Sequence, residues 1–128
     1  MKIDCVLDSS AVLAVIFAEP GHEAVEPMLP SAAISTVNAS EVITKLIRLG
    51  APAAEAVKAV DDLQLVVLPF TLEDAHLAAR LEPSTRRRGL SLGDRACLAL
   101  AHRCGVPAVT ADRNWRIPKL PVRVRLIR

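Results

Sequence analysis

Short apolar runs alternate with amphipathic segments along the whole chain. Strands are predicted for the runs IDCVL (3–7), AAIS (32–35), QLVVLPF (64–70) and PAVTA (107–111). The segment VRVRL (122–126) alternates strictly, with its arginines on one face, which is typical of an edge strand. Apolar residues at helical spacing predict helices over residues 11–18, 21–29, 38–49, 52–63, 72–81 and 92–104. Because strands separated by helices form parallel sheets, this order predicts a three-layer α/β/α fold around a mostly parallel sheet of 4–5 strands.

The composition is that of one apolar domain over residues 1–128. Apolar residues make up 52 % of the chain, which excludes disorder, and aromatic residues only 2 %, so alanine, valine and leucine must fill the core. No apolar run reaches the ~18–20 residues that span a bilayer, and two early aspartates interrupt any signal-peptide pattern. We therefore expect a soluble, cytoplasmic protein without membrane partners, whose three cysteines are reduced core thiols.

Charge is distributed unevenly along the chain. Residues 86–128 hold 11 lysines and arginines against 2 acidic residues, whereas residues 1–85 hold 5 and 12. Part of this basic charge lies in the predicted loop PSTRRRGLSL (83–92). A basic region of this kind suits a polyanionic partner, but a solvated surface that keeps the protein in solution explains the charge equally well.

Acidic residues follow the predicted strands. Ligands of parallel sheets gather beyond the carboxyl ends of the strands, which selects Asp8, Glu41, Glu73, Asp74, Asp112 and, at the start of the buried helix, Asp94. Each has a simpler interpretation as a helix cap, since NASE, TLED and SLGD are capping-box patterns. If the fold carries several into one pocket, their like charges need a cation, and oxygen ligands without matching His or Cys indicate Mg²⁺ or Mn²⁺. The pattern alone does not separate Asp74 from Glu41.

Four motifs resemble those of the PIN-domain family, and most closely the VapC-type toxins of toxin–antitoxin pairs. They are VLDSSAVLAV, ISTVNASEV, LSLGDRACLALA and TADRNW, in family order. The resemblance implies a single PIN domain whose catalytic acids are Asp8, Glu41, Asp94 and Asp112. It implies Asp8 and Asp94 as the main Mg²⁺ ligands, Asp112 as a further one, and Ser10 and Thr110 as supporting hydroxyls. Asp74 has no counterpart in these motifs and is expected to be a helix cap beside an edge strand.

The resemblance also implies a function and partners. It implies a Mg²⁺-dependent endoribonuclease, with Mn²⁺ as a possible substitute, that acts as a homodimeric toxin and binds a cognate antitoxin protein. Arg86, Arg87 and Arg88 are candidates for guiding the RNA backbone, and Arg95 is a candidate counter-charge for the acids.

Two other functions remain open. One is a PIN-fold binding module without catalysis, although the presence of all four acids argues against it. The other is a phosphatase that forms an aspartyl-phosphate on Asp8. Such a phosphatase is expected to carry a second aspartate two residues after the first, where this chain has Ser10.

Overall fold

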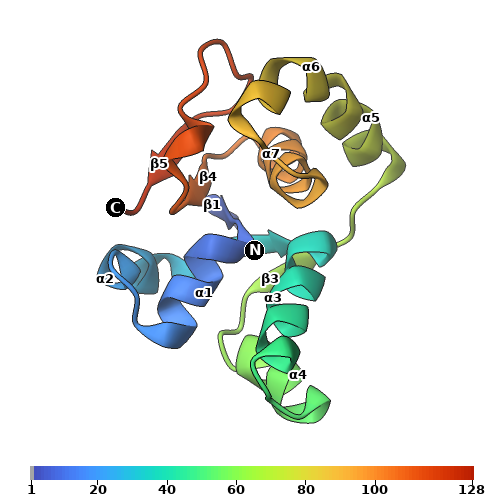
Figure 1. Cartoon of the computed structure of the whole chain (residues 1–128). Helices are drawn as coiled ribbons and strands as arrows, with labels where there is room; N and C mark the ends of the chain where they lie inside the picture. Colours follow the sequence, from blue (N-terminus) through green and yellow to red (C-terminus); the bar gives the residue numbers. More distant parts are fainter. Residues whose placement is uncertain (1) are drawn as a thin grey trace.

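The computed structural model describes residues 2–128 and is built around a five-stranded sheet (Figure 1). The strands are β1 (Cys5–Leu7), β2 (Ala32–Ser35), β3 (Val66–Leu68), β4 (Ala108–Thr110) and β5 (Val124–Leu126). Their order is β3-β2-β1-β4-β5, and every neighbouring pair is parallel. The mostly parallel sheet predicted from the sequence is therefore confirmed and is parallel throughout, with β3 and β5 at its two edges.

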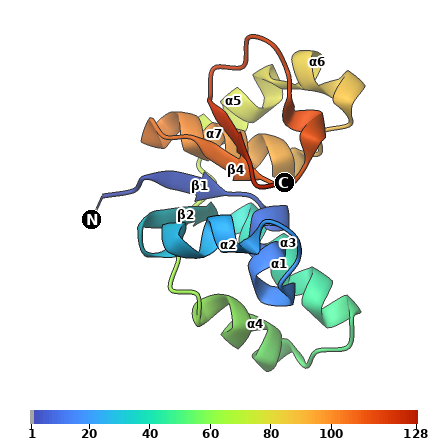
Figure 2. The same cartoon turned by 90° about the vertical axis from the view of Figure 1, so that its left-hand side faces the viewer.

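Helices cover both faces of this sheet. They are α1 (Ser9–Phe17), α2 (His22–Val25), α3 (Thr36–Arg48), α4 (Ala53–Asp61), α5 (Leu72–Arg80), α6 (Glu82–Thr85) and α7 (Leu92–Cys104). Figure 2 shows α1 to α4 on one side of the sheet and α5 to α7 on the other, which is the predicted three-layer arrangement. Short 3-10 turns at Glu26–Ser31, Arg86–Arg88 and Arg113–Trp115 complete the chain.

The alternation of side chains along the strands separates two apolar cores. In β1, Cys5 and Leu7 pack with α1, α3 and α4, while Val6 faces the opposite core against α7. Both cores consist mainly of alanine, valine and leucine, and Trp115 is the largest fully buried side chain. Cys5 and Cys97 are buried free thiols, and burial raises the pKa of both, as expected for structural cysteines.

Several predicted boundaries were wrong, each for a local reason. The helix predicted from Asn38 starts at Thr36, because Ser35 at the end of β2 accepts a hydrogen bond from the Val37 amide and caps it. The helix predicted over 21–29 is divided, since Pro27 and Pro30 favour the 3-10 turn that follows α2.

The predicted basic loop 83–92 is also partly helical. Pro83 occupies the first turn of α6, where its missing N–H costs nothing, and buried Thr85 donates to the Leu81 carbonyl at 2.8 Å. The three arginines continue from α6 as an exposed 3-10 turn. Across residues 2–128, none of the helices has the length and apolar character required to cross a bilayer.

Candidate active site

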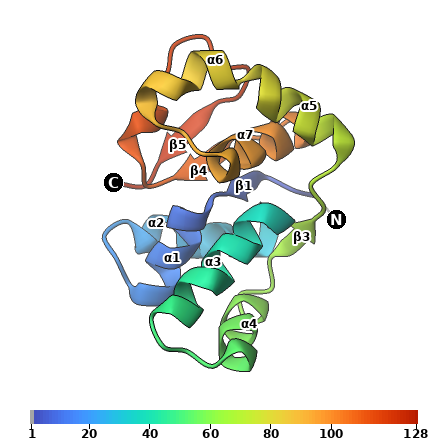
Figure 3. The same ribbon diagram turned by 45° about the vertical axis from the view of Figure 1, so that its right-hand side comes forward.

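The four predicted acids lie around the carboxyl end of the sheet centre, near enough for the charge of Asp94 to raise the pKa of Asp8 and for the charges of Glu41 and Asp112 to raise the pKa of Asp94. Asp8 follows β1 and Asp112 follows β4, the adjacent strand, while Glu41 lies on α3 and Asp94 in the first turn of α7. Figure 3 shows α1, α3 and α7 grouped around β1, with β4 beside it. The chain leaves β1 toward β2 on one side and returns to β4 on the other, so this is the point at which the strand order reverses and ligands of parallel sheets bind.

Asp8 is buried and held by three neighbours. Its Oδ1 accepts from the Ala11 amide at 2.8 Å and so caps α1, while the Ser10 hydroxyl lies 2.8 and 2.9 Å from its two oxygens. The Thr110 hydroxyl donates to Oδ2. Burial raises the pKa of Asp8 to about 6, against the lowering effect of these hydrogen bonds, and the charge of Asp94 adds to the rise. Asp8 is thus the N-cap of α1, in agreement with its simpler interpretation as a helix cap.

Ser10 and Thr110 lie where supporting hydroxyls were predicted. Ser10 Oγ accepts from the Ala111 amide at 2.9 Å, and Thr110 Oγ1 accepts from the Asp112 amide at 3.0 Å. The two hydroxyl oxygens are 3.2 Å apart. They therefore join the start of α1 to the end of β4 and hold Asp8 and the backbone of Asp112 in one hydrogen-bonded unit.

Asp94 interacts electrostatically with each of the other three acids. It forms a capping box with Ser91, in which each residue accepts a hydrogen bond from the other's backbone amide. Burial raises the pKa of Asp94, and the charges of Glu41 and Asp112 raise it further. Asp94 is thus both the helix cap and a member of the acidic cluster. One carboxylate can fill both roles, because the backbone amide of Ser91 bonds to one of its two oxygens.

Glu41 is positioned by residues that the sequence pattern did not identify. Its Oε1 accepts from Ser9 Oγ at 2.6 Å and from Asn38 Nδ2 at 2.9 Å. Asn38 is 1 % exposed and also donates to the Gly93 carbonyl at 3.1 Å, which links α3 to α7. The capping box predicted from NASE was therefore wrong. The spacing of three residues places Asn38 beside Glu41 on one helical face, which was the available signal.

Gly93 allows Glu41 to approach α7. A Cβ atom at this position would lie 2.5 Å from Cδ of Glu41, well inside van der Waals contact. The buried glycine in the first turn of α7 thus provides the space that the Glu41 carboxylate occupies.

The negative charge of this cluster is not neutralised by basic side chains. Within residues 2–128, the ion pairs involve other acids, such as Asp74, Asp62 and Glu82, and none of the four clustered acids. Asp112 instead caps the 3-10 turn Arg113–Trp115 by accepting from the Asn114 amide at 2.9 Å. The cluster is therefore an uncompensated group of carboxylates at a site where parallel sheets bind ligands.

The sequence model of the PIN domain matches residues 5–119, nearly the whole chain. The chain belongs to the PIN-domain family. The match includes all four acids and confirms the predicted resemblance. No curated protein sequence gives a significant match to the chain.

Solved structures show that this PIN domain has the common fold of the family. It is similar to a chain of DNA-bound VapBC from Salmonella typhimurium, with a TM-score of 0.73, 22 % identity and coverage of 98 % of this chain and 99 % of that one. A chain of Rickettsia felis VapBC2 bound to promoter DNA has the same score at 16 % identity, covering 96 % and 98 %. Mycobacterium tuberculosis VapC20, described as a sarcin–ricin loop cleaving toxin, has a TM-score of 0.68 at 19 % identity, covering 85 % and 90 %.

The donor chemistry of the PIN domain site fits a hard divalent cation. Its side-chain donors are carboxylate and hydroxyl oxygens, and the raised pKa values of Asp8 and Asp94 indicate that added positive charge would be favourable. In the part of the chain that the structure describes, no three acidic, His or Cys side chains are drawn together tightly enough to hold an ion. The four carboxylates accept hydrogen bonds from neighbouring backbone amides, hydroxyls and Asn38. The ligand set Asp8, Asp94 and Asp112 stays a prediction.

The basic candidates lie outside this hydrogen-bonded group. Arg86, Arg87 and Arg88 are exposed, and Arg86 is 3.6 Å from Glu82. Arg95 was expected to be a possible counter-charge for the acids, but its Nη1 donates to the Ala78 carbonyl of α5 at 2.9 Å. It follows Asp94 by one residue on the helix and so points to a different side of α7.

Asp74 is excluded from the site by the fold. It forms the predicted capping box with Thr71, next to edge strand β3. The sequence did not reveal that Asp74 is buried and accepts two hydrogen bonds from Arg103, whose Nε and Nη2 donate to it at 2.9 and 3.1 Å. Asp74 and Arg103 therefore form a structural ion pair between α5 and α7.

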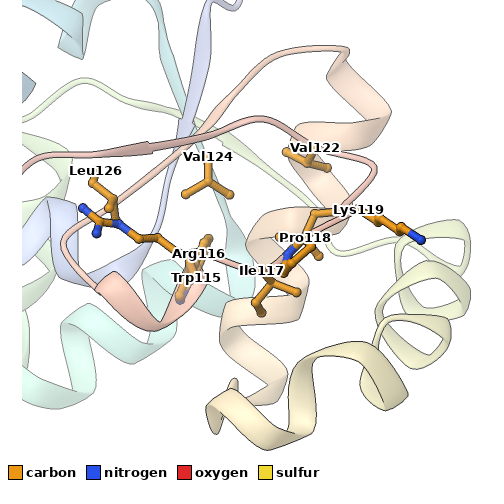
Figure 4. A pocket seen from close by; sticks show the side chains of 9 residues that line it. Trp115, Arg116, Ile117, Pro118, Lys119, Val122, Val124 and Leu126 are labelled. Atoms are coloured by element: carbon orange, nitrogen blue, oxygen red, sulfur yellow. The ribbon is translucent and has the colours of Figure 1, made fainter.

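Two of the surface hollows formed by residues 2–128 differ in their position relative to the acids. The larger, about 540 Å³, lies between β5 and the segment 115–122 and is lined mostly by apolar side chains (Figure 4). None of the four acids lines it. The other hollow, about 480 Å³, lies between α1 and α3 and includes Glu41 in its lining.

Proposed function

We propose that this PIN domain is a Mg²⁺-dependent endoribonuclease and the toxin of a toxin–antitoxin pair. The observation that carries the proposal is the convergence of four carboxylates on one edge of a parallel sheet without a basic partner. A structural role would favour neutralised or dispersed acids, because uncompensated like charges are costly when partly buried. Membership in the PIN-domain family supports a hydrolase acting on nucleic acid.

The residues of the chain have distinct tasks in this proposal. Asp8 and Asp94, with Asp112, would hold the cation, and Ser10 and Thr110 fix the orientation of the Asp8 carboxylate. Mg²⁺, or Mn²⁺ in its place, would supply phosphate neutralisation and a lowered pKa of the attacking water. Glu41 is solvent-accessible and held by Ser9, so its free carboxylate oxygen can accept a proton from water.

The solved structures support the biological role. Several similar chains come from complexes named VapBC or toxin–antitoxin, and VapC20 is described as cleaving the sarcin–ricin loop. By analogy, RNA is the proposed substrate and a cognate antitoxin the proposed protein partner. We further propose that the protein is cytoplasmic and forms a homodimer. Light scattering after size-exclusion chromatography tests the homodimer, and a monomer at micromolar concentration would contradict it.

Ribonuclease activity of the purified protein tests the central proposal. We expect cleavage of RNA with Mg²⁺, loss with EDTA, and a loss of at least about 100-fold in the Asp94→Asn variant, because removing a metal ligand removes its charge stabilisation. Asp61→Asn is the matched control, since Asp61 is an exposed acid on α4. Full activity of Asp94→Asn, with its fold checked by circular dichroism, would refute the assignment.

The alternatives predict other results. A non-catalytic binding module would neither cleave RNA nor bind Mn²⁺ in calorimetry. A phosphatase would trap phosphate on Asp8, but Ser10 at the position expected for its second acid donates to Asp8 instead.

A further inference from the structure

The hollow beside Glu41 continues along one face of α3. Its polar lining residues are Ser9, Ser40, Glu41, Thr44, Lys45 and Arg48. Lys45 and Arg48 follow Glu41 by four and seven residues, so they lie one and two turns further along the same helical face. At 1.5 Å per residue, the face extends about 10 Å from the carboxylate. The hollow is therefore a groove that begins at the acidic cluster and ends at two cations.

The charges of these two cations are available for a ligand. Both side chains are exposed, and among residues 2–128 neither takes part in an ion pair or a side-chain hydrogen bond. Lys45 does not pair with Glu41, although the spacing of four residues permits it. The sequence-predicted cation Arg86, by contrast, lies 3.6 Å from Glu82.

The lining of the groove suits a sugar–phosphate backbone. Two cations and the hydroxyls of Ser40 and Thr44 are the groups that contact phosphate and sugar oxygens in nucleic-acid complexes. Leu13 is the one aliphatic hydrophobic residue in the lining, and no aromatic ring is present there to stack a base. These features favour contacts that follow the backbone of a strand without reading its bases.

We propose that the groove between α1 and α3 binds the RNA strand on one side of the scissile phosphate, with Lys45 and Arg48 contacting backbone phosphates. This inference rests on the proposed ribonuclease function. A strand that reaches the acidic cluster past Glu41 carries one negative charge per nucleotide along this face, where Lys45 and Arg48 offset it. The sequence-predicted triplet Arg86–Arg88 is then not the principal backbone contact.

The salt dependence of RNA binding tests the groove. Binding of a fluorescent single-stranded RNA is measured by anisotropy over a salt series, with Asp94→Asn as the non-cleaving background. Each phosphate contact to a single strand contributes about −0.7 to the slope of log Kobs against log salt concentration. The double variant Lys45→Gln/Arg48→Gln should therefore make the negative slope less steep by about 1.4 and weaken binding to RNAs of different sequence alike.

Two further double variants remove the same charge elsewhere. Arg123→Gln/Arg125→Gln alters exposed residues at edge strand β5, and Arg87→Gln/Arg88→Gln alters the 3-10 turn. The β5 variant should leave the slope nearly unchanged, and the variant in the 3-10 turn should change it less than the groove variant does. An unchanged slope in the groove variant, or an equal change in either control, overturns the inference, even if the wild type cleaves RNA. Absence of both RNA binding and cleavage by the wild type would refute the proposed function as well.

Discussion

Gly93→Ala is the sharpest single test of how Glu41 is held. The added Cβ would lie 2.5 Å from Cδ of Glu41, so the carboxylate must rotate away from α7. In doing so it loses the hydrogen bonds from Ser9 Oγ, at 2.6 Å, and Asn38 Nδ2, at 2.9 Å. The buried Asn38 amide keeps its bond to the Gly93 carbonyl at 3.1 Å, which limits the damage.

The expected change in stability combines two opposing effects. Hydrogen bonds to a charged group contribute roughly 1.5–3 kcal/mol each, toward the lower end here because Glu41 can be solvated by water after it moves. Replacing glycine by alanine within a helix contributes about 0.5–1 kcal/mol of stabilisation. We therefore expect Gly93→Ala to lower the free energy of unfolding by about 2–2.5 kcal/mol, with a strong loss of RNA cleavage.

A double-mutant cycle isolates the contact. In the Glu41→Ala background the obstructing carboxylate is gone, so Gly93→Ala should be neutral or stabilising by up to about 1 kcal/mol. Urea unfolding of the four proteins, followed by circular dichroism, then gives a coupling energy of about 2–3.5 kcal/mol. A coupling energy below about 0.5 kcal/mol, meaning the same effect of Gly93→Ala in both backgrounds, would refute the argument.

Further predictions concern pH, cations and the remote ion pair. In EDTA, wild-type stability relative to Asp8→Asn should fall by roughly 3 kcal/mol as the pH rises from below 3.8 to above about 6, because folding favours the protonated carboxyl; a flat difference contradicts this. Mg²⁺ at 100 times its Kd should raise the free energy of unfolding by about 2.7 kcal/mol in the wild type, and an equal rise in Asp8→Asn would count against the site. Arg103→Met should lower stability by about 2–4 kcal/mol, since it leaves Asp74 buried and unpaired; cleavage should be retained under folding conditions, and unchanged urea unfolding would oppose this.

The sequence alone predicted much of the fold and the identity of the acids. Alternating strands and helices specified a parallel sheet, and the rule for strand ends selected Asp8 and Asp112. Both depend on short-range patterns: residues within a strand or a helical turn are close in space because they are close in sequence. Family motifs were needed to set Glu41 inside the cluster and Asp74 outside it. The sheet order β3-β2-β1-β4-β5 gives the physical reason, because Asp74 follows the edge strand β3, whereas the cluster lies at the ends of the central strands β1 and β4.

Only the tertiary structure determined how the acids are held. Thr110 meets Asp8 across 102 residues of sequence, and Asn38 meets the Gly93 carbonyl across 55. No local pattern encodes such contacts, because they depend on how α1, α3 and α7 pack against one another. The same packing formed the hollow between α1 and α3 that Glu41 and Lys45 line, and it placed the Ala78 carbonyl within reach of Arg95. The sequence thus indicated which residues are candidates for the chemistry, and the packing of distant helices decided which of their neighbours position them.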